Sequence, residues 1–137
     1  MTMTATTHRV GKLRHEVDVN GRHTIVTDEP LGLGGTDEGP APHELLPAAL
    51  ASCIATTIAI YAERHDWDIG DAFVDVEYDS ESEPRRFKIE VHLPAGLSDE
   101  HCRRLERVAE TCPLRHALEA GFKFEERVVS SPHSVGA

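Results

Sequence analysis

Residues 39–67, GPAPHELLPAALASCIATTIAIYAERHDW, form the longest apolar run in the chain, and Cys53 lies near its middle. No charged residue occurs from position 45 to position 62, where Ala, Leu, Ile and Thr predominate. Small side chains on all sides of a helix allow other backbones to approach closely from more than one direction. The stretch therefore predicts a long, fully buried central helix, which at about 1.5 Å per residue would cross a small domain.

The same run invites comparison with a membrane span, which requires about 20 apolar residues. Pro47, Ser52, Thr56 and Thr57 interrupt it, and Ala occurs where a bilayer would favour Leu or Ile. Acidic residues flank the run, and no basic cluster sets an orientation. We therefore expect the core helix of a soluble protein and no membrane partner.

Length and charge limit the remaining possibilities. The 137 residues fit one domain over 1–137, with loose tails at 1–8 and 131–137. A chain of this size has difficulty covering an all-round apolar helix, which predicts a homodimer. A net charge of -10 argues against a nucleic-acid partner. The sequence shows neither a secretory signal nor a disulfide framework, so a cytoplasmic location is expected.

The rest of the chain alternates between strand pairs and shorter helices. Asn20-Gly21 joins two β-type runs and is the strongest short hairpin signal. Ser98 is suited to cap one helix, and Pro113 to begin another that Gly121 ends. Adjacent hairpins rather than βαβ units predict an α+β fold. Strands are expected at 13–19, 23–28, 72–80, 85–94 and 122–129.

The segment 29–41, EPLGLGGTDEGPA, is rich in Gly and Pro. It superficially resembles a phosphate-binding loop, but it contains acids and no Lys, which disfavours a phosphate. We expect it to be a connection that packs over the start of the central helix.

Cys112 lies where a thiol can become reactive. As the residue before Pro113 it would cap a helix, near unpaired backbone N–H groups and the positive end of the helix dipole. Such a position lowers the pKa of a thiol below about 8.5, and Arg115 and His116 would act in the same direction. A plain structural cap is the alternative, and Cys102 is expected to be structural.

Cys53 alone would be read as a small, inert hydrophobe in a helix core. Burial raises the pKa of a thiol, so Cys53 would need a charged neighbour in order to react. His43 and Glu44 are candidates on the same helix, about 80° and 180° around it from Cys53. Glu44 would therefore act through an irregular start near Pro47 or across a dimer interface.

Other site chemistries find no support in the sequence. Although the chain has nine His and three Cys, it has no C-x-x-C, H-x-x-H or HExxH spacing, so no metal site is expected. No G-x-S-x-G motif occurs, which leaves a serine hydrolase unsupported.

GPAPHELLPAALASC, the helix end AERHDW and the later TCPLRHAL together resemble the osmotically inducible protein C (OsmC) family and its organic hydroperoxide resistance (Ohr) relatives. The resemblance covers nearly the whole chain. It implies an OsmC-like α+β fold, with antiparallel sheets packed around a long central helix. It also implies an intertwined homodimer with a site at each end of its interface.

The resemblance also implies a mechanism. Cys53 would attack the peroxide and become a sulfenic acid, and Cys112 would resolve it as a disulfide that an external dithiol reduces. No cofactor or metal would be required. In the family's peroxidases, a Glu at the position of His43 pairs with an arginine of the N-terminal hairpin.

Here Glu44 comes one place after that position, and the arginine could be Arg22, which we favour, or Arg14. His43 could instead act as a hydrogen-bonding or proton-carrying neighbour of Cys53. These departures place the chain closer to the broader OsmC-like branch than to the Ohr branch.

The sequence thus predicts a thiol-dependent peroxidase that reduces organic hydroperoxides. An apolar site would favour hydrophobic peroxides over hydrogen peroxide. The alternative is a non-catalytic dimer that binds a small apolar or thiol-bearing ligand, and a cysteine-dependent acyl-transfer enzyme is a weaker one.

Overall fold

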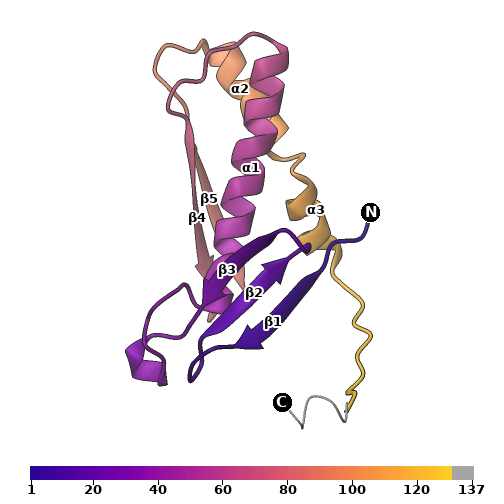
Figure 1. The fold of residues 1–137 in the computed structure, drawn as a ribbon. Helices are drawn as coiled ribbons and strands as arrows, with labels where there is room; N and C mark the ends of the chain where they lie inside the picture. Colours follow the sequence, from indigo (N-terminus) through magenta and orange to yellow (C-terminus); the bar gives the residue numbers. More distant parts are fainter. Residues whose placement is uncertain (131–137) are drawn as a thin grey trace.

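The long helix forms as predicted and organises the computed structural model, which describes residues 1–130. Helix α1 spans Leu45–Arg64 and follows a short 3-10 turn, η2, at Pro42–Glu44 (Figure 1). One row of its side chains is buried, because positions four apart lie on the same helix face. These residues are Leu50, Ile54, Ile58 and Ala62.

The first sheet contains one strand more than expected. Strands β1 (Ala5–Arg9), β2 (His15–Val19) and β3 (His23–Thr27) pair in an antiparallel meander. Asn20 and Gly21 both have positive φ, 55° and 71°, which suits the hairpin turn predicted at this dipeptide. The expected tail at 1–8 is wrong, because a Thr-rich run without bulky apolar residues in Ala5–Arg9 still pairs its backbone with β2.

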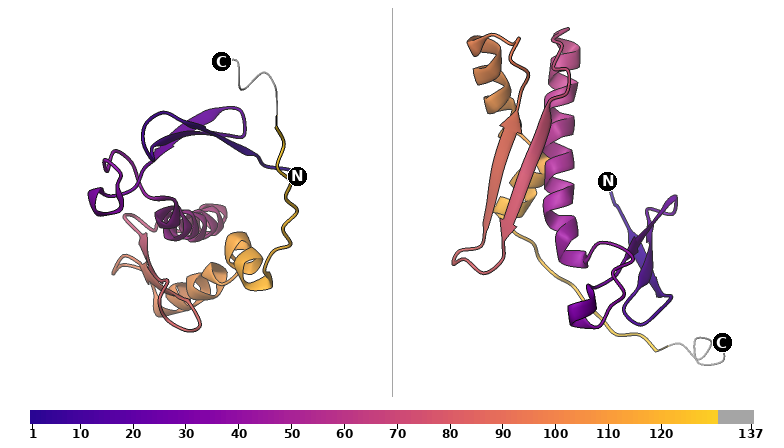
Figure 2. Two further views of the ribbon diagram at one scale, coloured as in Figure 1. Left: turned by 90° about the horizontal axis from the view of Figure 1, so that it is seen from below. Right: turned by 90° about the vertical axis from the view of Figure 1, so that its left-hand side faces the viewer.

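The second sheet is the predicted hairpin of β4 (Phe73–Asp79) and β5 (Arg86–His92). Its inner side chains alternate along the strands and pack against the apolar row of α1. They are Val74, Val76, Phe87, Ile89 and Val91. Figures 1 and 2 show this hairpin running alongside α1.

Helices α2 (Asp99–Ala109) and α3 (Pro113–Ala120) begin where the sequence predicts. The Ser98 side chain accepts a hydrogen bond from the His101 amide at 3.1 Å, which caps α2. Leu105 is fully buried against α1. The expected strand at 122–129 is wrong: this segment has no regular structure and is exposed, because no described strand pairs with it. The expected tail at 131–137 lies outside the described residues.

In a single chain the two sheets do not enclose a common core. The sheet β1–β3 lies near the N-terminal end of α1, apart from β4, β5 and α2 (Figure 2). The accessible surface is 10794 Å², whereas a compact monomer of 15.1 kDa would expose about 7,100 Å². Part of the excess comes from the exposed segment after α3, and part from the separation of the two sheets.

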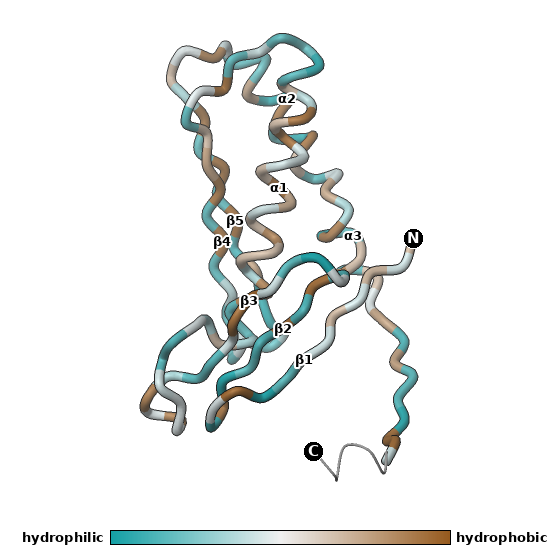
Figure 3. Tube along the Cα trace, in the orientation of Figure 1, coloured by the Kyte–Doolittle hydropathy of each residue, from teal (hydrophilic) through white to brown (hydrophobic). Residues whose placement is uncertain are grey.

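The prediction of a fully buried helix is therefore wrong for one protomer. Only one face of α1 is covered, and Ile60 on the other side remains 46% exposed. Figure 3 shows hydrophobic positions along α1 and in both sheets. By length and composition, residues Pro42–Arg64 could also cross a membrane, a test that the core helices of soluble proteins pass as well.

The core predicts a clear effect for Leu105→Ala. Removing a fully buried side chain leaves a cavity between α1 and α2, so the free energy of unfolding should fall by about 2–5 kcal/mol. Urea denaturation followed by circular dichroism at fixed protein concentration measures this loss. Arg103→Ala, on the exposed face of the same helix, should leave the value within about 0.5 kcal/mol.

Candidate thiol site

Cys53 is carried by the middle of α1. Its side chain is half-buried and packs against the hydrophobic cluster that α1 forms with α2 and the turn before α3. The Thr57 hydroxyl donates a hydrogen bond to the Cys53 carbonyl at 2.8 Å, one turn further along the helix. The thiol thus lies at the edge of the core, where solvent still reaches it.

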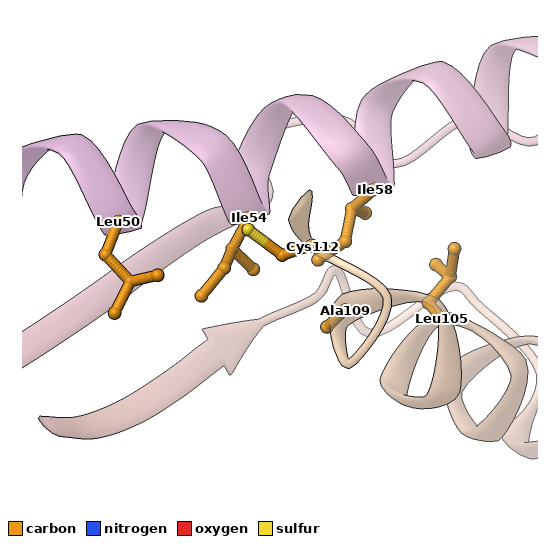
Figure 4. Close-up of a cluster of buried hydrophobic side chains, with 6 residues drawn as sticks. All are labelled: Leu50, Ile54, Ile58, Leu105, Ala109 and Cys112. Carbon is orange, nitrogen blue, oxygen red and sulfur yellow. The ribbon is translucent and has the colours of Figure 1, made fainter. Parts of the chain in front are cut away.

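Cys112 belongs to this cluster and lies at the N-cap of α3, and its side chain is fully buried. Figure 4 shows its sulfur directed at α1 beside Ile54. Cys53 packs against the cluster that contains Cys112 and lies close enough to influence its titration, and both cysteines are free thiols. The fold therefore brings together two thiols that are far apart in the sequence.

The predicted effect of the helix N-terminus on Cys112 is only partly right. Burial raises the pKa of this thiol, the backbone amides of Arg115 and Leu114 lower it, and the neighbouring Cys53 raises it further. The net result is a pKa above the ordinary value of 9.0, opposite to the prediction. Desolvation outweighs the helix amides because the sulfur is completely enclosed.

The residues expected to activate Cys53 do not contact it within one protomer. His43, Glu44 and Arg22 are exposed, and no hydrogen bond or ion pair links them to a cysteine in residues 1–130. The Glu44 carboxylate instead accepts a hydrogen bond from the Ala41 amide at 2.8 Å, so it caps the turn η2. Any charged partner of Cys53 would therefore have to be brought to it by a conformational change or by a second protomer.

The neighbours of Cys112 on α3 are also engaged elsewhere. Arg115 pairs with Glu119 at 3.6 Å, and the His116 ring donates to the Glu110 carbonyl at 3.0 Å. Neither side chain is directed at the Cys112 sulfur by these interactions. The helix backbone, rather than these cationic side chains, supplies the favourable field at this thiol.

A groove with apolar and charged lining lies between α1, β5 and α3, and neither cysteine lines it. Its volume is about 500 Å³, and its floor includes Leu50, which belongs to the same buried cluster as Cys112. Of the two arginines that line it, Arg115 was singled out from the sequence only as a neighbour of Cys112, and Arg85 was not singled out, because nothing in the local pattern marks it. Its lining residues are Leu50, Arg85, Phe87, Ile89, Arg115, Leu118 and Glu119.

Sequence reasoning also missed the order in the Gly-rich loop. Asp28 is 1% exposed and accepts several hydrogen bonds from this loop, while Arg14 forms an ion pair with Glu38. The available signal was the acid at the end of a strand followed by the closely spaced Gly34, Gly35 and Gly39. Within residues 1–130, no group of three or more His, Cys, Asp or Glu is arranged to hold a metal ion.

The fold agrees with the comparisons. The model of the OsmC-like protein family matches residues 35–127, so the chain belongs to this family. A structure from Psychrobacter arcticus 273-4, of an osmotic stress induced and detoxification response protein, is 30% identical with a TM-score of 0.69. That match covers 85% of this chain and 87% of the other.

An organic hydroperoxide resistance protein OsmC from Legionella pneumophila is 25% identical with a TM-score of 0.59, covering 86% of this chain and 89% of the other. The organic hydroperoxide resistance protein OhrB of Bacillus subtilis shares the fold at 22% identity and a TM-score of 0.53, covering 85% and 89%. Among curated proteins, no match is found.

The raised pKa of Cys112 predicts a loss of stability in alkali. The folded state favours the protonated thiol, so its contribution is complete below pH 9.0, the ordinary pKa, and is lost as the pH rises through the higher folded-state value. Urea denaturation between pH 7 and 10.5 should show this decline. Cys112→Ala should remove that part of the pH dependence, whereas Cys102→Ala should retain it.

Proposed function

We propose that this protein is a thiol-dependent peroxidase that reduces organic hydroperoxides. The observation that carries the proposal is the contact between a half-buried thiol, Cys53, and a fully buried one, Cys112. Two thiols at this spacing can form a disulfide after one of them has been oxidised. Family membership and the hydroperoxide resistance proteins among the structural relatives support the same chemistry.

The accessible thiol acts first. The Cys53 thiolate attacks one oxygen of the O–O bond, which breaks; the sulfur becomes a sulfenic acid and the other oxygen leaves as an alcohol after taking up a proton. The Cys112 thiolate then attacks the Cys53 sulfur, forming the disulfide and breaking the S–O bond, and the hydroxide takes up a proton and leaves as water. An external dithiol reduces this disulfide and is itself oxidised. No resident cofactor is required in this scheme.

The burial of the two thiols supports the order in which they react, and the groove lining supports the class of peroxide. Cys112 is sealed from solvent, so a peroxide reaches Cys53 first. The groove between α1, β5 and α3 includes Leu50, Phe87, Ile89 and Leu118 in its lining, and this apolar part suits a hydrophobic substituent on the peroxide. We therefore propose a preference for organic hydroperoxides over hydrogen peroxide.

The proposed active form is a homodimer. The exposed face of α1 and the unusually large accessible surface are explained if a second copy packs against this helix. The charged partner of the Cys53 thiolate would then be completed in the assembly, from His43, Glu44 and a hairpin arginine, Arg22 or Arg14. A cytoplasmic location, where external dithiols are kept reduced, fits this cycle.

Intact mass spectrometry tests the disulfide. One equivalent of cumene hydroperoxide should lower the mass of the reduced protein by about two units, as expected when two thiols lose two hydrogens. Cys53→Ser should abolish both the mass change and the consumption of peroxide, and Cys102→Ser should leave both intact. An unchanged mass in the wild type would contradict the peroxidase and favour a dimer that binds a ligand without chemistry.

Sedimentation equilibrium tests the assembly. The wild type should have twice the mass of the 15.1 kDa chain. Ile60→Asp introduces a charge on the uncovered face of α1 and should shift the population toward monomer, because burying an unpaired charge is costly. Lys88→Asp, on the exposed face of β5, is the matched control and should remain dimeric. A monomeric wild type would refute the dimer.

A further inference from the structure

The groove between α1, β5 and α3, the α3 groove, combines a buried apolar floor with charged side chains nearer to solvent. Its volume is about 500 Å³, which is within the range of pockets that hold small organic molecules. Leu50 on its floor is 1% exposed. Among the charged residues of its lining, Arg115 is half-buried, whereas Arg85 and Glu119 are exposed. The lining therefore changes from apolar in the interior to charged at the opening.

The alternation of side chains along β5 places a cation at the end of an apolar row. Side chains two positions apart lie on the same face of a sheet, so Arg85 continues the row of Phe87 and Ile89. The ring of Tyr78 on β4 stacks on Phe87 with their centroids 4.8 Å apart, which holds this part of the floor in place. The adjacent Arg86 falls on the opposite, outer face of the hairpin and is not part of the lining.

Helix α3 supplies the second cation. Arg115, Leu118 and Glu119 are three and four positions apart, so they share one face of the helix. The Nε atom of Arg115 is 3.6 Å from the Glu119 carboxylate, and its guanidinium has further N–H groups that can donate to another acceptor. Arg85 forms no ion pair within residues 1–130. Two guanidinium groups and one carboxylate leave the lining with an excess of positive charge, although the whole chain has a net charge of -10.

A second groove, between α1 and β4, lacks such charges. Its volume is about 340 Å³, and the residues of the described chain that line it, among them Ile58 and Val74, include no charged one. A purely apolar molecule would fit either groove. A molecule with an apolar chain and an anionic end fits the α3 groove better, because only this groove offers cations beside its apolar surface.

We propose that the α3 groove binds a linear alkyl carboxylate. The carboxylate accepts charge-assisted hydrogen bonds from Arg85 and Arg115, and the hydrocarbon chain lies on the floor between Leu50 and Leu118. The single excess positive charge matches a monoanion better than a phosphate, whose charge of about -2 would be repelled by Glu119.

The ligand is a free carboxylate rather than a lipid within a membrane, because a chain with a net charge of -10 is repelled by anionic lipid surfaces. Cys53 and Cys112 do not line the α3 groove. Binding of the carboxylate therefore involves no thiol chemistry, and this inference goes beyond the peroxidase proposed above.

Isothermal titration calorimetry of the reduced full-length protein with decanoate, below its micelle-forming concentration, tests this site. We expect one decanoate per chain. Octanoate, which is two methylenes shorter, should bind roughly 15-fold more weakly, because each buried methylene contributes roughly a fourfold change in affinity. Decanol and decylammonium have the same chain without the negative charge, and both should bind more weakly than decanoate.

Matched variants locate the carboxylate. Arg85→Gln should weaken decanoate binding by roughly fivefold while changing the affinity for decanol much less. Arg86→Gln makes the same charge change on the adjacent residue of the outer face and should leave decanoate binding unchanged. Leu118→Asp places a negative charge on the floor and should abolish binding, with circular dichroism checking that the variant remains folded. Equal decanoate affinities for Arg85→Gln and Arg86→Gln would overturn the proposal.

Other occupants of the groove give different results. If a second copy of the chain covers it, the dimeric wild type will not bind decanoate whereas the monomer produced by Ile60→Asp will, and this result would overturn the proposal. Binding to phosphatidylglycerol vesicles without binding to free decanoate would overturn it as well, in favour of a lipid surface.

Failure of this site is distinguishable from failure of the peroxidase. Cys53→Ser should retain the decanoate affinity of the wild type, because the thiol is not part of the lining. Decanoate binding in a protein that does not consume hydroperoxides would support the site and refute the peroxidase. Peroxide turnover without any decanoate binding would retain the peroxidase and refute the site.

Discussion

The packing of one apolar row of α1 against α2 and the turn before α3 is the contact on which the rest of the structure depends. Leu50, Ile54 and Ile58 supply the row, and Leu105 meets it from α2. Because the interior tolerates few voids, this contact fixes where α2 ends and therefore where Cys112 lies. The two thiols meet as a consequence of core packing.

Within this fold, burial and backbone geometry compete at Cys112. A helix N-terminus favours a thiolate, and the predicted cap forms at the expected residue. Complete enclosure nevertheless raises the pKa, because the charged sulfur would lose its hydration. Within residues 1–130, the exposed charged residues near the start of α1 do not contact either cysteine, so they do not offset this cost in one protomer.

Much of the architecture could be predicted from local patterns. The long apolar run, the Asn20-Gly21 turn and the caps at Ser98 and Cys112 are short-range signals, and each produced the expected element. Predictions failed where pairing was not local: β1 has no apolar alternation, and the segment at 122–129 has no described strand beside it. The order of the Gly-rich loop after β3 could not be predicted from the sequence, because it depends on side-chain hydrogen bonds across ten residues, between Asp28 and Glu38.

The complete enclosure of Cys112 also constrains how a Cys53–Cys112 disulfide could be opened again. A bulky reductant can approach only the sulfur at the edge of the core, so the mixed disulfide must form on Cys53 and the Cys112 sulfur must depart as the anion. The amides of Leu114 and Arg115 would receive that charge. In such a cycle the helix N-terminus would partly offset the desolvation of the leaving thiolate, and steric access would decide which sulfur the reductant attacks.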